Sequence, residues 1–140
     1  MYVAQVRPRW SDMDVFGHVN HANMVTLLEE ARVPLLFDEA GRAGLPEFSK
    51  GMVVVRLAVD YRAPIVVGGQ EIRVEITLKD LKFASLTLAY QVHDGPGARD
   101  KVAVTAETVL APYDVATNRP RRLTAEERAF MRTRLTEAGA

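Results

Sequence analysis

The hydrophobic period changes once along this chain, and that change restricts the fold more than any other feature. From Met52 to Leu110, apolar residues recur at every second position, as in strands with one buried and one solvent-facing side. Turn sequences rich in Gly, Pro, Asp and Lys separate four such segments, which indicates antiparallel pairing. The inward-facing residues are predicted to be Val55, Leu57, Val59 and Tyr61; Ile72, Val74, Ile76 and Leu78; Leu86, Leu88, Tyr90 and Val92; and Val102, Val104, Ala106, Thr108 and Leu110.

The segment before these strands has a helical period instead. Apolar residues from Asn20 onward recur at steps of three and four, which predicts an amphipathic helix that ends near Gly41. Such a helix is roughly 30 Å long at 1.5 Å per residue. Pro34 is expected to kink it, because the proline ring clashes with the carbonyl group one turn earlier. The apolar face consists of Met24, Leu27, Leu28, Ala31 and Leu35.

Two end segments complete the expected architecture. Residues 2–10 read as a further strand, which Pro8 restricts to a sheet edge or a strand end. Residues 123–138 read as a terminal helix. Because every strand is apolar on one side only, the sheet should cover the long helix with its apolar face. We therefore predict one α+β domain over residues 1–140, in which an antiparallel β-sheet wraps around one long central α-helix.

The charge and cysteine content exclude several classes of function. Eighteen Lys and Arg residues balance eighteen Asp and Glu residues, so no overall field attracts nucleic acid or an anionic membrane. The absence of cysteine excludes disulfides, thiolate nucleophiles and thiolate metal ligands. No segment has the apolar length of a signal peptide or a membrane span. These features predict a soluble, cytoplasmic protein.

Polar residues are concentrated where the predicted helix begins, in the stretch RWSDMDVFGHVNHAN. A helix start has unpaired N–H groups and partial positive charge, so it stabilises an oxygen that becomes anionic during a reaction. Gly17 permits a tight turn that brings backbone N–H groups close to a ligand. Asp14 places a carboxylate nearby, and an aspartate that is ionised at neutral pH serves as nucleophile or general base. Together these residues favour attack on a polarised carbonyl carbon.

This stretch, with LLEEAR and VDYRAPIVVGG after it, resembles the hotdog-fold acyl-CoA thioesterases of the 4-hydroxybenzoyl-CoA thioesterase-like family. The D-x-D-x-x-G-H-V-N block that opens the helix carries most of the resemblance. It implies a hotdog fold that hydrolyses an acyl- or aroyl-CoA thioester to free acid and CoA, without a metal or redox cofactor. It places the catalytic carboxylate at Asp14 and the carbonyl-polarising amides at Gly17 through His21. It also implies a homodimer or homotetramer with its sites between protomers.

The candidate site residues form two groups. The catalytic candidates are Asp14, Gly17, His18 and His21. The substrate-binding candidates are Asn20 and Asn23 at the helix start, together with three cations suited to the phosphates of coenzyme A, namely Arg56, Arg62 and Lys82.

Structural roles are alternatives for some of these residues. Asp12 and Asn20 suit caps of the turn and of the helix. Glu29 or Glu30 on the helix is a second candidate carboxylate, although a surface pair with Arg32 is the simpler explanation.

Other functions also fit parts of the pattern. Asp14 with His18 suits proton transfer in a hotdog dehydratase or hydratase. Asp12, Asp14, His18 and His21 form an acceptable ligand set for zinc or manganese, although a metal there would displace the oxyanion arrangement. A sensor that binds acyl-CoA without hydrolysing it is the non-enzymatic alternative.

Overall fold

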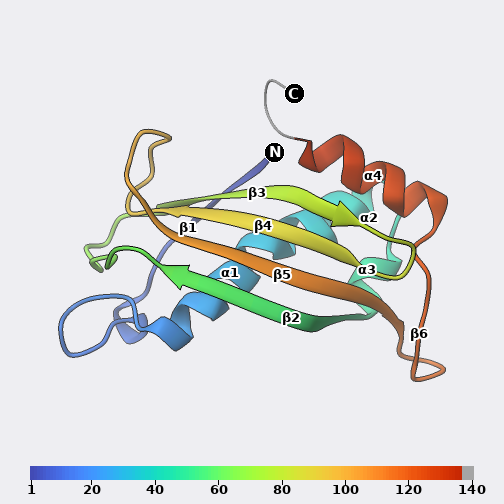
Figure 1. The fold of residues 1–140 in the computed structure, drawn as a ribbon, viewed down its shortest axis with the longest axis horizontal. Helices are drawn as coiled ribbons and strands as arrows, with labels where there is room; N and C mark the ends of the chain where they lie inside the picture. The colour runs from blue at the N-terminus through green and yellow to red at the C-terminus, as the bar shows by residue number, and fades with distance from the viewer. Residues whose placement is uncertain (137–140) are drawn as a thin grey trace.

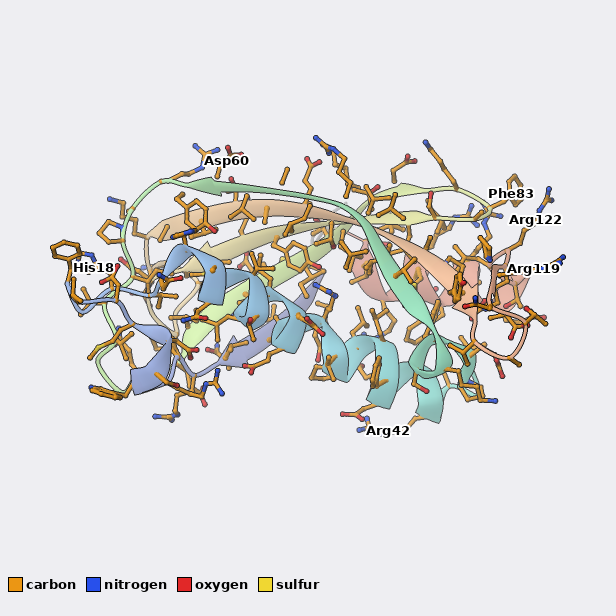
Figure 2. The ribbon with its side chains drawn as sticks, turned by 90° about the horizontal axis from the view of Figure 1, so that it is seen from below. His18, Arg42, Asp60, Phe83, Arg119 and Arg122 are labelled. Atoms are coloured by element: carbon orange, nitrogen blue, oxygen red, sulfur yellow. The ribbon has the colours of Figure 1, made fainter. Side chains whose placement is uncertain are left out.

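The computed structural model describes residues 1–136, and its centre is an antiparallel sheet with the strand order β1-β3-β4-β5-β2. The sheet arches over helix α1, which runs along its apolar face (Figures 1 and 2). The predicted α+β architecture with a helix against an antiparallel sheet is thus confirmed. The strands are β1 (Tyr2–Val6), β2 (Met52–Tyr61), β3 (Ile72–Leu81), β4 (Leu86–His93) and β5 (Val102–Asp114), and the short strand β6 (Arg119–Pro120) pairs with β5.

The core lies between α1 and the sheet, and the alternation of the strands explains it. Side chains at every second position of β3 and β4 are almost fully buried, including Ile76 and Leu88 at 0% exposure. β1 occupies one edge of the sheet and ends before Pro8, as predicted. The interior strands β3, β4 and β5 are paired on both sides.

Strand β2 forms the other edge and departs from strict alternation. A bulge at Val55 shifts its register against β5, so that Val54 pairs with Leu110 and Arg56 pairs with Val109. Val54 rather than Val55 therefore occupies the inner side before the bulge, which corrects the sequence expectation. After the bulge the prediction is confirmed, because Leu57 lies opposite the buried Thr108.

The central helix is shorter than predicted. Helix α1 spans His21–Val33, 13 residues, and regular α-helix stops there because Pro34 cannot donate the next backbone hydrogen bond. The chain continues as a π-helical turn, η2 (Pro34–Glu39), and a short helix, α2 (Ala40–Arg42). The left-handed residue that ends this run is Gly44, with φ of 80°, and not Gly41.

The remaining helices complete one end of the molecule. Helix α4 (Ala125–Leu135) confirms the predicted terminal helix, although residues 137 and 138 of that prediction lie outside the described part of the chain. A capping box formed by Thr124 and Glu127 fixes where α4 begins. The short elements η1 (Trp10–Asp12) and α3 (Glu47–Lys50) have no periodic signal in the sequence. No helix within residues 1–136 combines the length and apolar character that a membrane crossing requires.

Candidate active site

A cavity of about 380 Å³ lies where the end of β2 meets the start of α1. It brings Asp14, His18 and His21 together with Tyr61 and Arg62, which are distant in sequence. The rest of its wall is formed by Val19, Met24, Ala63, Pro64, Ile65 and Val104. Most of the predicted catalytic residues therefore share one cavity.

Backbone pairing holds the two segments of this site together. Val19 N–H donates to Ile65 O at 2.8 Å, and Val67 N–H donates to Gly17 O at 3.1 Å. Gly17 has a φ of 78°, a conformation that side chains rarely adopt, so a glycine is required at this turn. The loop before α1 is thus fixed against the segment after β2.

The carboxylate of Asp14 is oriented by its own loop. Its Oδ1 accepts hydrogen bonds from the backbone N–H groups of Phe16 at 2.8 Å and His18 at 3.3 Å. Its Oδ2 accepts no hydrogen bond from any residue in 1–136. Asp14 is half-buried and lines the cavity. One oxygen is therefore anchored and the other is available to a reacting group.

The amides expected to polarise a carbonyl differ in their availability. Gly17 N–H donates to Asp14 O at 3.1 Å, and the N–H groups of Val19 and Asn20 also have backbone acceptors. His18 N–H donates to the Asp14 carboxylate. Of the five backbone amides from Gly17 through His21, only that of His21 therefore has no acceptor within residues 1–136. It opens the first turn of α1, where the helix dipole favours a negative oxygen.

Tyr61 joins the end of β2 to the start of α1, and the sequence pattern marked it only as a core position. Its hydroxyl donates to His21 O at 2.5 Å, and the Tyr61 and His21 rings meet edge to face with centroids 6.4 Å apart. Partial burial raises the pKa of Tyr61, so the phenol remains a hydrogen-bond donor at neutral pH. Tyr61 therefore fixes the position of the unpaired His21 amide.

Residues 8–136 match the sequence model of the thioesterase-like superfamily. The chain belongs to this superfamily. Its reaction class is therefore the hydrolysis of thioesters. No curated protein has a significantly similar sequence.

Solved thioesterase structures share this fold. A thioesterase from Thermus thermophilus, complexed with coenzyme A and Zn, is 29% identical, with a TM-score of 0.74 over 94% of this chain and 92% of that one. A putative thioesterase from Pseudomonas aeruginosa is 28% identical, with a TM-score of 0.73 over 91% and 95% of the two chains. A 1,4-dihydroxy-2-naphthoyl-CoA thioesterase from Synechocystis shares the fold at 15% identity, with a TM-score of 0.73 over 93% and 94%.

Asp12 has a structural role in this thioesterase. Its side chain is 1% exposed and accepts hydrogen bonds from Arg9, at 2.7 Å from the backbone N–H and at 3.0 Å from Nη2. The hydrogen bond from the Arg9 side chain lowers the pKa of Asp12, so this carboxylate stays ionised although it is buried. Asp12 thus closes the turn before α1, as its capping interpretation predicts.

Asn20 and Asn23 also stabilise the loop and do not line the cavity. Asn20 caps α1, with its Oδ1 accepting from Ala22 N–H at 2.9 Å, and Asn23 Nδ2 donates to Asp12 O at 3.3 Å. Within residues 1–136, no three His, Asp or Glu side chains are close enough to hold one metal ion. The alternative zinc or manganese ligand set does not converge because Asp12 is enclosed with Arg9.

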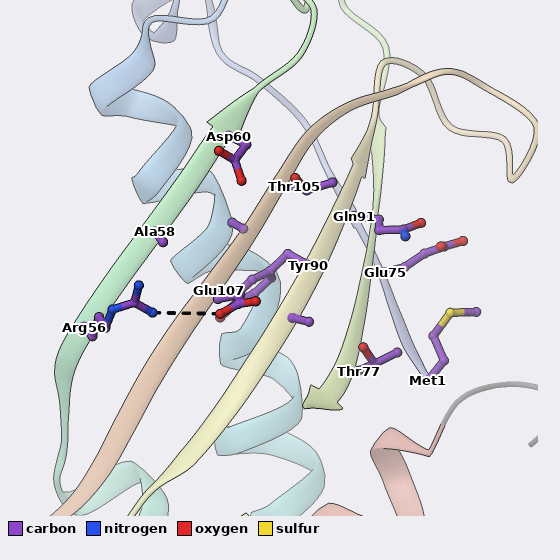
Figure 3. Close-up of a pocket in the computed structure, with 12 residues that line it drawn as sticks. Met1, Arg56, Ala58, Asp60, Glu75, Thr77, Tyr90, Gln91, Thr105 and Glu107 are labelled. Atoms are coloured by element: carbon purple, nitrogen blue, oxygen red, sulfur yellow. Dashed lines mark ion pairs between the residues drawn. The ribbon is translucent and has the colours of Figure 1, made fainter. Parts of the chain in front are cut away.

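Of the three candidate phosphate-binding cations, one lines the cavity of this thioesterase. Arg62 is exposed there, with its Nε donating to Thr105 Oγ1 at 3.2 Å. Arg56 lies on the sheet face away from α1, 3.9 Å from Glu107, in a hollow of about 690 Å³ (Figure 3). Lys82 lies 3.9 Å from Asp80 in the β3–β4 turn.

Lys82 and the cavity are far apart within one protomer. Figure 2 shows Phe83, which follows Lys82 in the chain, at the opposite end of the molecule from His18. Lys82 therefore does not belong to the cavity of its own protomer.

Proposed function

We propose that this thioesterase hydrolyses acyl-CoA thioesters in the cavity at the start of α1. The observation that carries the proposal is that an anchored carboxylate, Asp14, and His21, whose backbone amide has no acceptor within residues 1–136, line the same cavity. The coenzyme A bound to the Thermus thermophilus relative supports CoA as the thiol portion of the substrate. The strand order and the helix against the sheet support the hotdog fold expected from the sequence.

In the proposed mechanism the His21 N–H donates to the thioester carbonyl oxygen. Asp14 either attacks the carbonyl carbon or removes a proton from a water molecule that attacks it. The carbonyl oxygen becomes anionic in the tetrahedral intermediate, and the helix start stabilises it; one such donor contributes on the order of 10²–10³-fold in rate. Collapse of the intermediate breaks the C–S bond, and CoA leaves as a thiolate that takes a proton. On the general-base route the acid is then released directly. On the nucleophilic route the acyl group remains on Asp14 as an anhydride, which a water molecule hydrolyses to release the acid and restore the carboxylate.

We further propose that the protein is a homodimer joined along the free edge of β2. This edge exposes apolar side chains, among them Val55 at 63% and Val54 at 49%, and only its other side pairs with β5. An exposed apolar strand edge is a template for pairing with another strand. A second copy of β2 in antiparallel orientation satisfies this edge and brings the end of one β2 beside the start of the other.

If the dimer forms through β2, a charged side chain on this edge should prevent dimerisation. We expect Val55→Lys to convert a dimer into a monomer of about 15.5 kDa in light scattering, because a lysine on a strand edge opposes pairing. Val115→Lys is the matched control, since Val115 is also 63% exposed but lies outside β2. A dimer that persists in Val55→Lys would show that the copies meet elsewhere.

The substrate assignment is tested by thiol release from acyl-CoAs and from the matching acyl-pantetheines. We expect release from both, with a higher KM for the pantetheines because they lack the nucleotide phosphates that Arg62 and, from the second protomer, Lys82 are proposed to contact. Arg62→Gln should reduce this difference between the two thiols. Equal KM values would indicate that the nucleotide is not recognised.

The same assay separates the alternative functions. Hydration of an enoyl-CoA, or dehydration of a 3-hydroxyacyl-CoA, without thiol release would identify a hydratase or dehydratase. Acyl-CoA binding without any turnover would identify a sensor.

A further inference from the structure

Arg32 is a buried cation for which residues 1–136 provide no counter-ion. Its side chain lies on the sheet-facing side of α1, and the residue is 9% exposed. No carboxylate within residues 1–136 lies within 4 Å of its guanidinium, so the pair with Glu29 or Glu30 suggested by the sequence does not form. An uncompensated charge in such a position is costly unless a partner of opposite charge is supplied.

The neighbours of Arg32 do not neutralise it. The only hydrogen bond of its side chain within the described chain runs from Nη1 to Tyr90 Oη at 3.4 Å. Tyr90 Oη is also 2.7 Å from Thr108 Oγ1. Burial raises the pKa of Tyr90, so this phenol is neutral at pH 7 and is no counter-ion. Since a guanidinium has five N–H donors, most of those of Arg32 remain for a ligand.

Arg32 lines a second cavity, of about 320 Å³, at the far end of α1 from Asp14. Most of the wall is apolar and includes Leu36, Phe37, Phe48, Met52, Val54 and Leu110. Two other charged residues line the wall. Lys50 is already paired with Glu47 at 3.0 Å, and the carboxylate of Glu29, one turn before Arg32 on α1, lies more than 4 Å from the Arg32 guanidinium. A fork of unpaired donors in a mostly apolar wall suits a molecule with an apolar body and one carboxylate.

The proposed dimer connects this cavity with the catalytic one. α1 and β2 run in opposite directions, because Tyr61 at the end of β2 bonds to His21 at the start of α1, while Met52 at the start of β2 lines the Arg32 cavity. Antiparallel pairing of two β2 strands therefore places the Asp14 cavity of one protomer beside the Arg32 cavity of the other.

We propose that the Arg32 cavity binds a carboxylate at the far end of the acyl group whose thioester lies at Asp14 of the neighbouring protomer. The preferred substrates are then thioesters of dicarboxylic acids. This inference rests on the proposed acyl-CoA thioesterase function and on the β2-paired dimer.

The test compares acyl-CoAs that differ only in the terminal carboxylate, such as adipyl-CoA with hexanoyl-CoA and suberyl-CoA with octanoyl-CoA. We expect the wild type to show a kcat/KM at least about tenfold higher for the carboxylated member at the fitting length, as a charged hydrogen-bonded pair provides. Arg32→Met should abolish this preference while hexanoyl-CoA or octanoyl-CoA is still hydrolysed. Arg32→Lys, which keeps the charge without the fork, should retain part of it.

Lys50→Gln is the matched control, because it removes a cation of the same cavity that already has a partner. It should leave the preference intact. Equal kcat/KM values for the paired substrates in the wild type, unchanged in Arg32→Met, would overturn the inference but not the thioesterase function.

A binding measurement tests the anion site at Arg32 separately from the acyl-CoA thioesterase function. Titration calorimetry with octanoate and the neutral octanamide requires no turnover, and we expect the wild type to bind octanoate more tightly and Arg32→Met to lose the difference. If no acyl-CoA is hydrolysed, the acyl-CoA proposal fails and the acyl part of this inference fails with it. Selective octanoate binding without a preference among acyl-CoAs would likewise overturn the acyl assignment and leave a site for a free acid. No selective binding would overturn the anion site itself.

Discussion

Asp14→Asn is expected to reduce kcat/KM for acyl-CoA hydrolysis by about 10²–10⁴-fold, the range for loss of a nucleophile or general base. The substitution is nearly isosteric, and an asparagine Oδ1 still accepts the hydrogen bonds that Phe16 and His18 donate to Asp14. The loop should therefore keep its conformation while the reactive oxygen is lost. Thiol release in steady state measures the effect, and circular dichroism confirms the fold.

Asp38→Asn is a suitable control, because Asp38 is an exposed carboxylate on η2 that does not line the catalytic cavity. It should leave kcat/KM within about twofold of the wild type, as for surface substitutions generally. Equal rates in Asp14→Asn and the wild type would remove Asp14 from the mechanism and direct attention to Glu29 and Glu30 on α1.

Gly51→Ala is expected to destabilise the protein by about 3 kcal/mol, through overpacking against backbone that cannot move freely. A Cβ atom at position 51 would lie 2.2 Å from Tyr113 O, and the two residues are also joined by the hydrogen bond from Tyr113 N–H to Gly51 O at 3.1 Å. The backbone of Gly51 is extended, so the cause is lack of space and not conformational strain. Urea unfolding measures the loss.

Gly41→Ala is the same chemical change, but it is expected not to lower the stability of the protein. Gly41 lies in α2, and a Cβ there would meet nothing within 4 Å. Alanine in a helix is more favourable than glycine by about 0.5–1 kcal/mol, so this variant should be as stable as the wild type or more so. If Gly51→Ala unfolded at the same urea concentration as the wild type, the start of β2 would have to be far more adaptable than its contact with Tyr113 implies.

The alternation of the sequence predicted the sheet well, because a half-buried strand must place apolar residues on one side. It did not predict the bulge at Val55 or the exposure of the β2 edge, since every valine of that strand carries the same local signal. Whether an apolar strand side is covered by the same chain depends on which strands become its neighbours.

The central helix shows the same division. Its apolar face and its start at Asn20 followed from residue spacing and capping. Pro34 indicated an interruption, but the switch to a π-helical turn and the glycine that ends the run, Gly44, depend on how the chain packs after the interruption.

For the site, the sequence identified the segment and the structure selected among its members. Asp12 and Asp14 are both aspartates two residues apart, yet one is enclosed with Arg9 and the other lines the cavity. Tyr61 was added to the site by the structure, and Arg62, a candidate cation in the sequence, lies beside Asp14 because the loop before α1 pairs with the segment after β2. The sequence could not show that the amide of His21 differs from its neighbours in having no acceptor. The acceptors of the neighbouring amides, such as Ile65 O for Val19, are brought close only when the chain folds.

The sequence by itself thus determined the elements, their amphipathic faces and the polar segment at the start of α1, since these depend on local spacing and residue chemistry. Only the tertiary structure decided, within residues 1–136, which carboxylate is free, which amide is unpaired and that Arg32 is buried without a counter-ion. Those properties depend on contacts between segments far apart in the chain, and no local pattern encodes them.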